Sequence, residues 1–333
     1  MKKWIVLSII SLLIACQSKT ESVDLSMYYW KTNYKLSSIE QSFLQENDIE
    51  KVYIRYCDVG LKNDHPVPIA PIEWNDEVTL PKEVIPVIYI KNEVFLKPNL
   101  EIKDLVQKLH AYIQQIHSKA SISPTHIQFD CDWSLNSKKQ YFEFLKEFKK
   151  QTNYDLSATI RLHQIKYFEK TGVPPVDHGV LMYYNMGTIA ANDLNSIYDR
   201  EVALQYISRL SDYPLALDIA LPIFSWGVHS REGKIVNVIG GLRSGDFNAI
   251  SSLKKIKTST YIVEDEYLYE GRLLQKGDII KIEEVSEKEL LQIANDLTKY
   301  LNQKPKEIIL YDLNEKNIKS YEKEIFKTIR QGY

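Results

Sequence analysis

Apolar and polar residues follow two different patterns that alternate along this chain. Short runs rich in valine, isoleucine and tyrosine have the length and composition of buried β-strands. Between these runs, apolar residues recur every three or four positions, which is the spacing of one helix face. The clearest helix face spans positions 102–116. Ser37 or Ser38, followed by Glu40, has the signature of a capping box that begins an earlier helix.

The strand-like runs number eight. A loop with several prolines, at 64–82, follows the second run, and helical stretches follow most of the others. Eight strands alternating with helices indicate an α/β fold, the (β/α)8 or TIM barrel. The expected strands are 26–30, 51–59, 85–90, 126–133, 156–163, 179–184, 215–224 and 307–313.

One stretch, 227–286, interrupts this alternation. It contains short β-like runs at 260–263 and 278–282, separated by glycine turns. We expect a mainly β insertion between strands seven and eight. The expected organisation is a signal peptide at 1–15, a lipidated tether at 16–25, barrel segments at 26–226 and 287–333, and the insertion at 227–286.

The first fifteen residues have the pattern of an export signal. Lys2 and Lys3 precede an apolar run that is shorter than the about 20 residues needed to span a bilayer. The run ends in Leu-Ile-Ala-Cys, the lipobox of bacterial lipoproteins, which predicts a diacylglyceryl group on Cys16. The alternative is an ordinary secretory signal with a cysteine there by chance. Because Gln17 and not aspartate follows the cysteine, nothing marks inner-membrane retention, and we expect a lipid anchor in the outer membrane of the bacterial envelope.

Charge and cysteine content narrow the classes of partner. The formal net charge is −2 and no basic block is present, which argues against nucleic acid as a partner. Cys57 and Cys131 lie inside apolar runs, so they are either buried as small apolar side chains or paired with each other in an oxidising compartment. No cluster of residues has the spacing of metal ligands, so the sequence indicates neither a metal nor another cofactor.

Four tryptophans are expected to lie on one face of the barrel. Active sites of such barrels lie at the carboxyl ends of the strands. Trp30, Trp133 and Trp226 are expected at the ends of strands one, four and seven, and Trp74 lies in the loop after strand two. Tryptophan rings are surfaces on which sugars stack through their apolar C–H faces. The alternative is that each ring is packing at the barrel mouth.

The fourth expected strand has a polar face near that mouth. Every second residue of a strand points the same way, so Gln128, Asp130, Asp132 and Ser134 are expected to face the interior together. Buried carboxylates need partners. The basic candidates are Arg161 and His163 on strand five and Arg55 on strand two. The alternative to a functional site is a structural ion network.

Three motifs resemble the family-18 glycoside hydrolases, the chitinase-like barrels. The segment 127–134 is similar to their strand-four signature Asp-x-x-Asp-x-Asp-x-Glu, Met-Tyr-Tyr-Asn at 182–185 to their Met-x-Tyr-Asp/Asn, and 217–227 to their Gly-x-Pro-x-Tyr segment. The general layout is also similar to an uncharacterised bacterial lipoprotein family related to that superfamily. The resemblance implies a glycan as ligand.

The chain departs from the family signature at two positions. Ser134 stands where the family has its proton-donating glutamate, and Ile127 replaces the first aspartate. The resemblance implies that Asp132 would steer the acetamido group of the sugar, with Tyr184 and Asn185 assisting. A serine hydroxyl is too weak an acid to replace a carboxylic acid tuned near neutrality. Other acids that follow expected strands are Asp58, Glu93 and Asp312.

Three functions remain open. The first is a glycoside hydrolase whose acid lies outside the signature; Asp132 with one of those other acids would form a pair of carboxylates. The second is a catalytically silent barrel that binds a glycan. The third is a structural or assembly lipoprotein that uses its outer surface or its insertion, since a fold does not determine a function.

Overall fold

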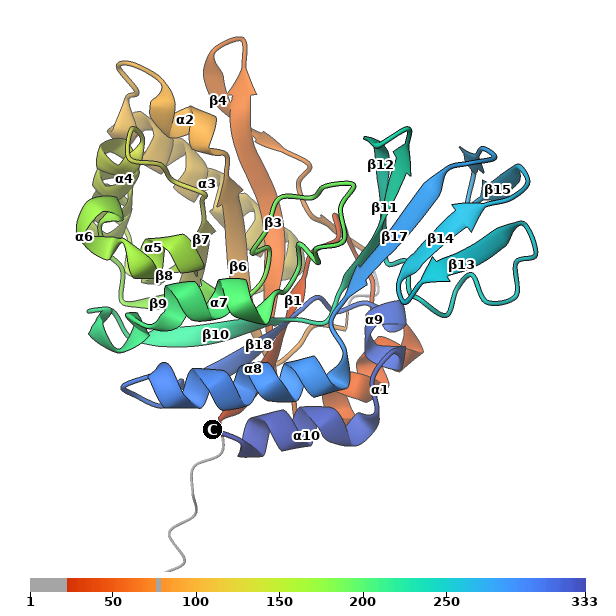
Figure 1. Cartoon of the computed structure of the whole chain (residues 1–333). Coiled ribbons are helices and arrows are strands. Elements are labelled where there is room, and N and C mark those ends of the chain that lie inside the picture. Colours follow the sequence, from red (N-terminus) through yellow and green to blue (C-terminus); the bar gives the residue numbers. More distant parts are fainter. Residues whose placement is uncertain (1–22, 76–78) are drawn as a thin grey trace, which may run out of the picture.

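The computed structural model describes residues 23–75 and 79–333. The expected signal peptide, Cys16 and nearly all of the expected tether lie outside the described residues. The described chain forms a closed barrel of eight parallel strands surrounded by helices (Figure 1), which confirms the predicted fold class. The barrel strands are β1 (Asp24–Tyr29), β3 (Lys51–Lys62), β6 (Glu83–Ile90), β7 (His126–Asp130), β8 (Asp155–Arg161), β9 (His178–Met182), β10 (Leu217–Pro222) and β18 (Glu307–Tyr311). They follow this order around the barrel, and β18 pairs with β1 to close it.

Helices cover the outside of the barrel. The first, α1, begins after Ser37, whose side chain accepts a hydrogen bond from Glu40 N–H while the Glu40 side chain accepts one from Ser37 N–H. This confirms the capping box. The 19-residue α3 buries the apolar face predicted from positions 102–116. The helices are α1 (Ser38–Glu46), α2 (Asn92–Leu96), α3 (Ile102–Ala120), α4 (Lys138–Gln151), α5 (Leu162–Lys166), α6 (Phe168–Thr171), α7 (Arg200–Ile207), α8 (Glu287–Tyr300), α9 (Glu315–Lys319) and α10 (Lys323–Gln331).

The second strand of the barrel is followed by a hairpin. Strand β3 runs past the expected end at 59, and β4 (His65–Ile69) folds back antiparallel along it. Pro66 and Pro68 fit there because an edge strand does not need every backbone N–H for pairing. A short strand β5 (Glu73–Trp74) then pairs with β2 (Asn33–Tyr34). The stretch expected as a loop at 64–82 therefore contains two strands.

The fourth to the eighth predicted strands all end two or three residues earlier than the apolar pattern suggested, and three of these early ends move residues of the expected site. Strand β7 was expected to extend to Trp133, but it ends at Asp130. Strand β8 ends at Arg161, whose N–H donates to the Gln164 side chain as α5 begins, so His163 lies in a helix. Strand β10 ends at Pro222, and Trp226 belongs to the first strand of the insertion.

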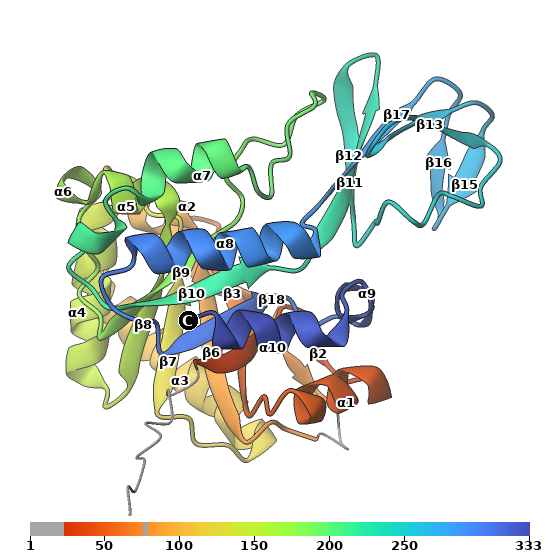
Figure 2. The same cartoon turned by 60° about the horizontal axis from the view of Figure 1, so that its bottom comes forward.

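The insertion is a separate β-sheet with its own core. Five strands pair in the order β12-β11-β17-β14-β13, and a hairpin of β15 and β16 lies beside them. Figures 1 and 2 show this sheet projecting from the side of the barrel. Its strands are β11 (Ser225–Arg231), β12 (Lys234–Gly240), β13 (Leu253–Lys257), β14 (Thr260–Val263), β15 (Tyr267–Tyr269), β16 (Arg272–Leu274) and β17 (Ile279–Glu284), and its core contains Phe247, Tyr261, Leu274 and Ile280.

The floor of the barrel, at the amino ends of the strands, contains buried polar groups. The Glu307 carboxylate accepts hydrogen bonds from Ser26 and from Tyr53 (2.7 Å), and lies 3.3 Å from Lys51 Nζ. Asp218 accepts two backbone N–H groups, and burial raises its pKa to about 7. These bonds reduce the free-energy cost of burying the two carboxyl groups, because an unpaired buried charge is strongly destabilising.

Two further findings concern the cysteines and the length of the helices. Cys57 and Cys131 are both buried and unpaired, so of the two readings the structure supports small apolar packing. Across residues 23–75 and 79–333, no helix has the length and apolar character needed to cross a bilayer.

Candidate functional site

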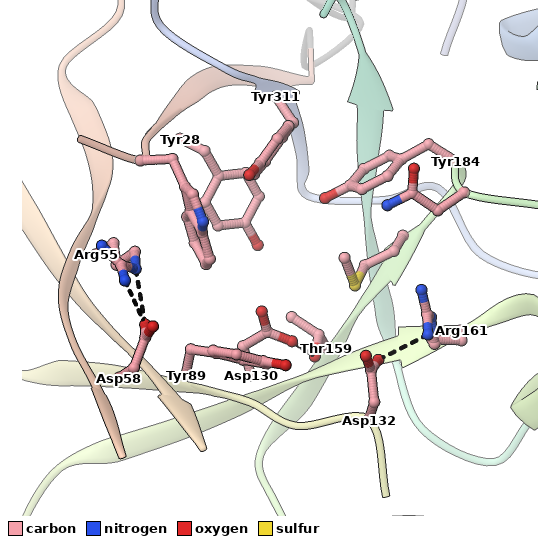
Figure 3. Close-up of a pocket in the computed structure, with 13 residues that line it drawn as sticks. Tyr28, Arg55, Asp58, Tyr89, Asp130, Asp132, Thr159, Arg161, Tyr184 and Tyr311 are labelled. Atoms are coloured by element: carbon pink, nitrogen blue, oxygen red, sulfur yellow. Dashed lines mark hydrogen bonds and ion pairs between the residues drawn. The ribbon is translucent and has the colours of Figure 1, made fainter. Parts of the chain in front are cut away.

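A cavity of about 250 Å³ opens at the carboxyl ends of the barrel strands. Its lining comes from seven of the eight strands or from residues directly after them, as expected for a site in this fold. Figure 3 shows the side chains converging on a common space. The lining consists of Tyr28, Trp30, Arg55, Asp58, Tyr89, Asp130, Asp132, Thr159, Arg161, Met182, Tyr184, Asn185 and Tyr311.

Asp130 is the buried acid of the cavity. It is the last residue of β7 and is only 7% exposed. Its carboxylate accepts a 2.6 Å hydrogen bond from the Thr159 hydroxyl on the neighbouring β8. Burial raises the pKa of Asp130 to about 6, and the nearby Asp132 carboxylate adds to the effect. Asp130 is therefore a group that changes charge close to neutral pH.

The other two carboxylates of the cavity form ion pairs with arginine. Asp132 lies beyond the end of β7, and its Oδ1 is 3.0 Å from Nη1 of Arg161 (Figure 3). Asp58 lies on β3, and its Oδ1 is 2.6 Å from Nη2 of Arg55. Of the three expected basic partners, Arg55 and Arg161 thus reach the cavity.

His163 does not join this group. It lies in α5, is exposed, and is absent from the cavity lining because the strand ends two residues before it. Burial of part of the ring and the neighbouring Arg161 lower its pKa. The prediction that His163 faces inward from strand five was wrong.

Aromatic rings form one wall of the cavity. The Tyr311 ring lies 5.5 Å from Trp30, 5.3 Å from Tyr184 and 5.6 Å from Tyr28, measured between centroids. The Tyr28 hydroxyl donates a 2.6 Å hydrogen bond to Gln128, which lies inside the barrel as predicted. A wall of rings beside charged and polar groups suits a ligand with apolar faces and many hydroxyls.

Tyr184 and Asn185 follow β9 and reach the cavity together. Tyr184 is buried, and burial raises its pKa well above the usual value, so its hydroxyl stays protonated. Asn185 has a left-handed backbone (φ 55°), a conformation that asparagine tolerates better than most residues. Met182, the first residue of the same motif, completes this side of the lining.

Ser134, at the signature position of the missing glutamate, lies outside the cavity lining. Its backbone N–H donates to the Ser137 hydroxyl at 2.8 Å, and the two hydroxyls are 3.2 Å apart. Lys138 N–H in turn donates to the Ser134 carbonyl at 2.9 Å. Ser134 therefore lies in the turn that leads into α4, and the expectation that it shares an inward strand face with Asp132 was wrong.

Of the four tryptophans, all within the described residues, Trp30 alone lines the cavity. Trp133 is 3% exposed, stacks on Tyr141, and donates its indole N–H to the Thr171 carbonyl. Trp74 packs against Tyr34 and Tyr56 beside β2 and β5. The half-buried Trp226 lies in β11 against Phe224. The structure therefore does not bring the four rings to one surface.

Of the three further acids, Asp58 alone lines the cavity. Glu93 is in α2, where it accepts a hydrogen bond from Leu61 N–H. Asp312 accepts a 2.7 Å hydrogen bond from the Asn317 side chain, and burial raises its pKa to about 6. Neither Glu93 nor Asp312 belongs to the cavity, because each is held by backbone or amide groups behind the rim.

Sequence reasoning missed four lining residues, Tyr28, Tyr89, Thr159 and Tyr311. Tyr311 ends the eighth strand, so the rule that found Asp130, namely reading the last inward residues of each strand, also identifies it. Thr159 is two residues before the end of β8 and directly faces Asp130. An alternating strand reading of 155–161 would have placed it inside.

Comparisons with known proteins find the same fold and little sequence similarity. No protein-family profile and no curated protein sequence matches the chain. A chitinase from Bacteroides thetaiotaomicron has a TM-score of 0.56 and is 10% identical over 93% of this chain and 97% of that one. A class V chitinase from Nicotiana tobaccum has a TM-score of 0.53 and 11% identity over 94% of this chain and 99% of that one. The spore cortex-lytic enzyme SleL of Bacillus megaterium QM B1551 has a TM-score of 0.51 and 14% identity, over 93% of this chain and 74% of that one.

At these identities the similarity shows the fold alone. It extends over nearly the whole chain, insertion included, and the similar structures are named as chitinases or as a cortex-lytic enzyme. The barrel is thus the same as that of the chitinases, as the three sequence motifs predicted. A shared fold does not imply a shared catalytic residue, and position 134 is a serine where the family signature has its glutamate.

Proposed function

We propose that this chain is a lipid-anchored envelope protein whose chitinase-like barrel binds a glycan without cleaving it by the family-18 route. One observation carries the second half of the proposal. Ser134, where the signature has its acid, hydrogen-bonds to Ser137 at the start of α4 and does not line the cavity. The cavity therefore lacks the family's proton donor at the signature position, which supports binding over cleavage by that route.

The cavity has the properties of a site for one sugar ring at a time. Its volume of about 250 Å³ is close to the lower limit of small-ligand pockets. Trp30 and Tyr311 offer ring faces, while the Asp132–Arg161 and Asp58–Arg55 pairs offer fixed donors and acceptors for hydroxyls. A class V chitinase of the same fold has been seen in complex with NAG4, which makes N-acetylglucosamine oligomers the first ligands to test.

The binding proposal is tested by calorimetry with tetra-N-acetylchitotetraose and with peptidoglycan glycan strands from which the stem peptides have been removed. We expect saturable binding by the wild-type chain, weakened about five- to thirtyfold in Trp30→Ala and Tyr311→Ala, because each removes a stacking surface worth about 1 to 2 kcal/mol. The exposed Leu268→Ala, on the insertion hairpin, is the matched control and should bind normally. Failure of the wild-type chain to bind any member of a broad glycan array would overturn the proposal in favour of a structural or assembly role.

A hydrolase is the second candidate, favoured by Asp130. A buried carboxylic acid with a pKa of about 6 in a sugar-sized cavity fits a general acid, and Asp132 lies nearby as a second carboxylate. If turnover of a glycan is found, it should disappear in both Asp130→Asn and Asp132→Asn and survive in Ser134→Ala. No turnover, with binding intact, leaves the binding function.

The lipid anchor is the part of the proposal that rests on sequence. The lipobox ending at Cys16 supports it. Labelled palmitate should be incorporated by the wild-type chain and not by Cys16→Ala, and the variant should move from the outer-membrane fraction to the soluble one. Unchanged membrane fractionation of Cys16→Ala would show that the anchor is not this lipid.

A further inference from the structure

A buried carboxylate on the insertion joins the insertion sheet to the chain segment between β9 and α7. Glu283, in β17, is 1% exposed and lies directly opposite Trp226 of β11. Its Oε2 accepts a 2.9 Å hydrogen bond from the Trp226 indole N–H. The same oxygen accepts the Ser196 backbone N–H at 2.9 Å and the Ser196 hydroxyl. Three donors from two chain segments therefore meet on one oxygen.

Lys281 balances this charge and extends the attachment. Its Nζ is 2.5 Å from Glu283 Oε1, and it also donates to the carbonyls of Ala190 (3.1 Å) and Leu194 (2.7 Å). Ala190, Leu194 and Ser196 all lie in the segment between β9 and α7. The ion pair thus fixes that segment to the face of the insertion sheet. Pairing with Lys281 makes the buried Glu283 charge far less costly than an unpaired one, which would cost several kcal/mol.

The segment held by Glu283 leads back to the cavity. The Ser196 carbonyl accepts the Gly187 N–H at 3.2 Å, and Gly187 lies two residues after Asn185. Asn185 lines the cavity with its left-handed backbone. Glu283 therefore restrains, through Ser196 and Gly187, the chain directly after Asn185.

The Trp226 ring leads to the cavity by a second route. It lies 5.1 Å from the Phe224 ring, which in turn lies 5.7 Å from Tyr184 and 5.5 Å from Tyr311. Tyr184 and Tyr311 both line the cavity. The indole therefore continues the aromatic wall outward, toward the insertion, and its rotation is fixed by the bond to Glu283.

The geometry assigns Glu283 as a positioning residue of the glycan site, one that orients the Trp226 ring and the Asn185 side chain together. The insertion is then part of the binding site, and a glycan of several sugars leaves the cavity over Phe224 toward Trp226. This inference rests on the proposed glycan binding. It predicts that replacing Glu283 lowers the affinity for an oligosaccharide more than the affinity for a monosaccharide, which is confined to the cavity.

The test compares Glu283→Gln with a matched control in the full-length chain extracted in detergent. Asp296→Asn is the control, because Asp296 is a 3% exposed carboxylate in α8 that pairs with Arg200 at the start of α7, and not with Ser196 or Trp226. We expect Glu283→Gln to weaken tetra-N-acetylchitotetraose binding at least tenfold and N-acetylglucosamine binding less than threefold. Asp296→Asn should leave both affinities within twofold even where it lowers the melting temperature.

A double-mutant cycle separates positioning from general damage. Trp226→Phe keeps a ring and removes the indole N–H, so in the Glu283→Gln background it should add almost no further loss of affinity. Additive losses, or a Glu283→Gln chain that binds the tetrasaccharide like the wild type, would overturn the assignment.

A readout without ligand keeps this inference distinct from the proposed function. The Trp226 indole N–H signal in a 15N-labelled chain should exchange slowly with water, and Glu283→Gln should accelerate that exchange and shift the Asn185 side-chain amide. If no glycan binds but these signals change as stated, the proposed function fails and the positioning stands. Unchanged signals in Glu283→Gln would refute the positioning itself.

Discussion

Asp132 and Arg161 meet across the gap between two neighbouring barrel strands, with 3.0 Å between carboxylate and guanidinium. Asp132 lies two residues after the end of β7, and Arg161 is the last residue of β8. The pair is partly open to solvent, at 42% and 31% exposure of the two side chains. In the proposed glycan site its position in the cavity would make it a recognition element, and its exposure gives it little weight in folding.

Arg161→Gln is therefore expected to reduce binding and not stability. Exposed ion pairs contribute about 0 to 1 kcal/mol to the free energy of unfolding, so the melting temperature should change by a few degrees at most. Tetrasaccharide affinity should fall about tenfold, because Asp132 loses the partner that fixes its orientation. Lys108→Gln, which breaks a surface pair with Asp104 on α3, is the control with no expected effect on affinity. A large loss of stability with unchanged affinity would contradict the assignment of this ion pair to binding and not to folding.

Asp130 should make the wild-type chain less stable as pH rises from about 4 to about 6. Burial raises the pKa of Asp130 to about 6 in the folded chain, above 3.8 when unfolded, so folding favours the protonated form and ionisation costs stability. Asp130→Asn removes this cost while the amide oxygen still accepts from Thr159. The variant's advantage in free energy of unfolding should be small at pH 4, grow to about 2 to 3 kcal/mol, and level off above about pH 7. A difference that does not vary with pH would show that Asp130 is not the titrating group.

Lys51, on the barrel floor, should contribute more to the free energy of unfolding than its partial exposure suggests. Lys51→Met leaves the buried Glu307 carboxylate without its 3.3 Å counter-charge, a loss of about 3 to 5 kcal/mol for a broken buried pair. The double variant Lys51→Met with Glu307→Gln should recover part of that stability, because it removes the charge while Ser26 and Tyr53 keep a hydrogen-bond partner. Chemical denaturation at pH 8 measures both. Equal stability of the single and double variants would argue against an unpaired charge as the cause.

Ser134→Glu should not create a chitinase. Ser134 lies in the turn before α4 and does not line the cavity, so a carboxyl group there would start from the wrong place. We expect no release of sugar from tetra-N-acetylchitotetraose and little change in stability, because the bonds from the Ser134 backbone to Ser137 and Lys138 do not depend on its side chain. Measurable hydrolysis by this variant would show that the site lacks only its acid.

Trp133 and Trp30 should have opposite roles. Trp133→Phe loses the indole bond to the Thr171 carbonyl and part of the stacking on Tyr141, so it should unfold at a lower temperature and bind normally. Trp30→Phe should keep its stability and lose affinity, since this ring lines the cavity. Thermal melts and calorimetry on the same two proteins decide, and identical behaviour of the two variants would contradict the assignment.

The sequence was sufficient for the barrel because its strands are apolar and long enough to be counted, and for Asp130 and Gln128 because both lie inside regular strand β7. It failed where a strand ends. Alternation places Ser134 and Trp133 correctly only if β7 continues to them, and it does not. His163 was lost in the same way, because a turn of helix rotates side chains by a different angle than a strand. The pairing of Glu283 with Ser196 joins residues far apart in sequence, and no local pattern indicates it.

The first barrel strand begins on the floor, where Asp24 N–H bonds to the Lys306 carbonyl and Arg330 bonds to the Val23 carbonyl. The chain therefore enters the barrel at the end opposite to the cavity. From Cys16 to Asp24 a fully extended chain reaches at most about 30 Å. With a lipid on Cys16, the floor would rest near the bilayer and the mouth would open toward the aqueous side. The cavity would then bind a polymer from solution, at its end or along its length, and would not reach lipid-linked sugars of the same membrane.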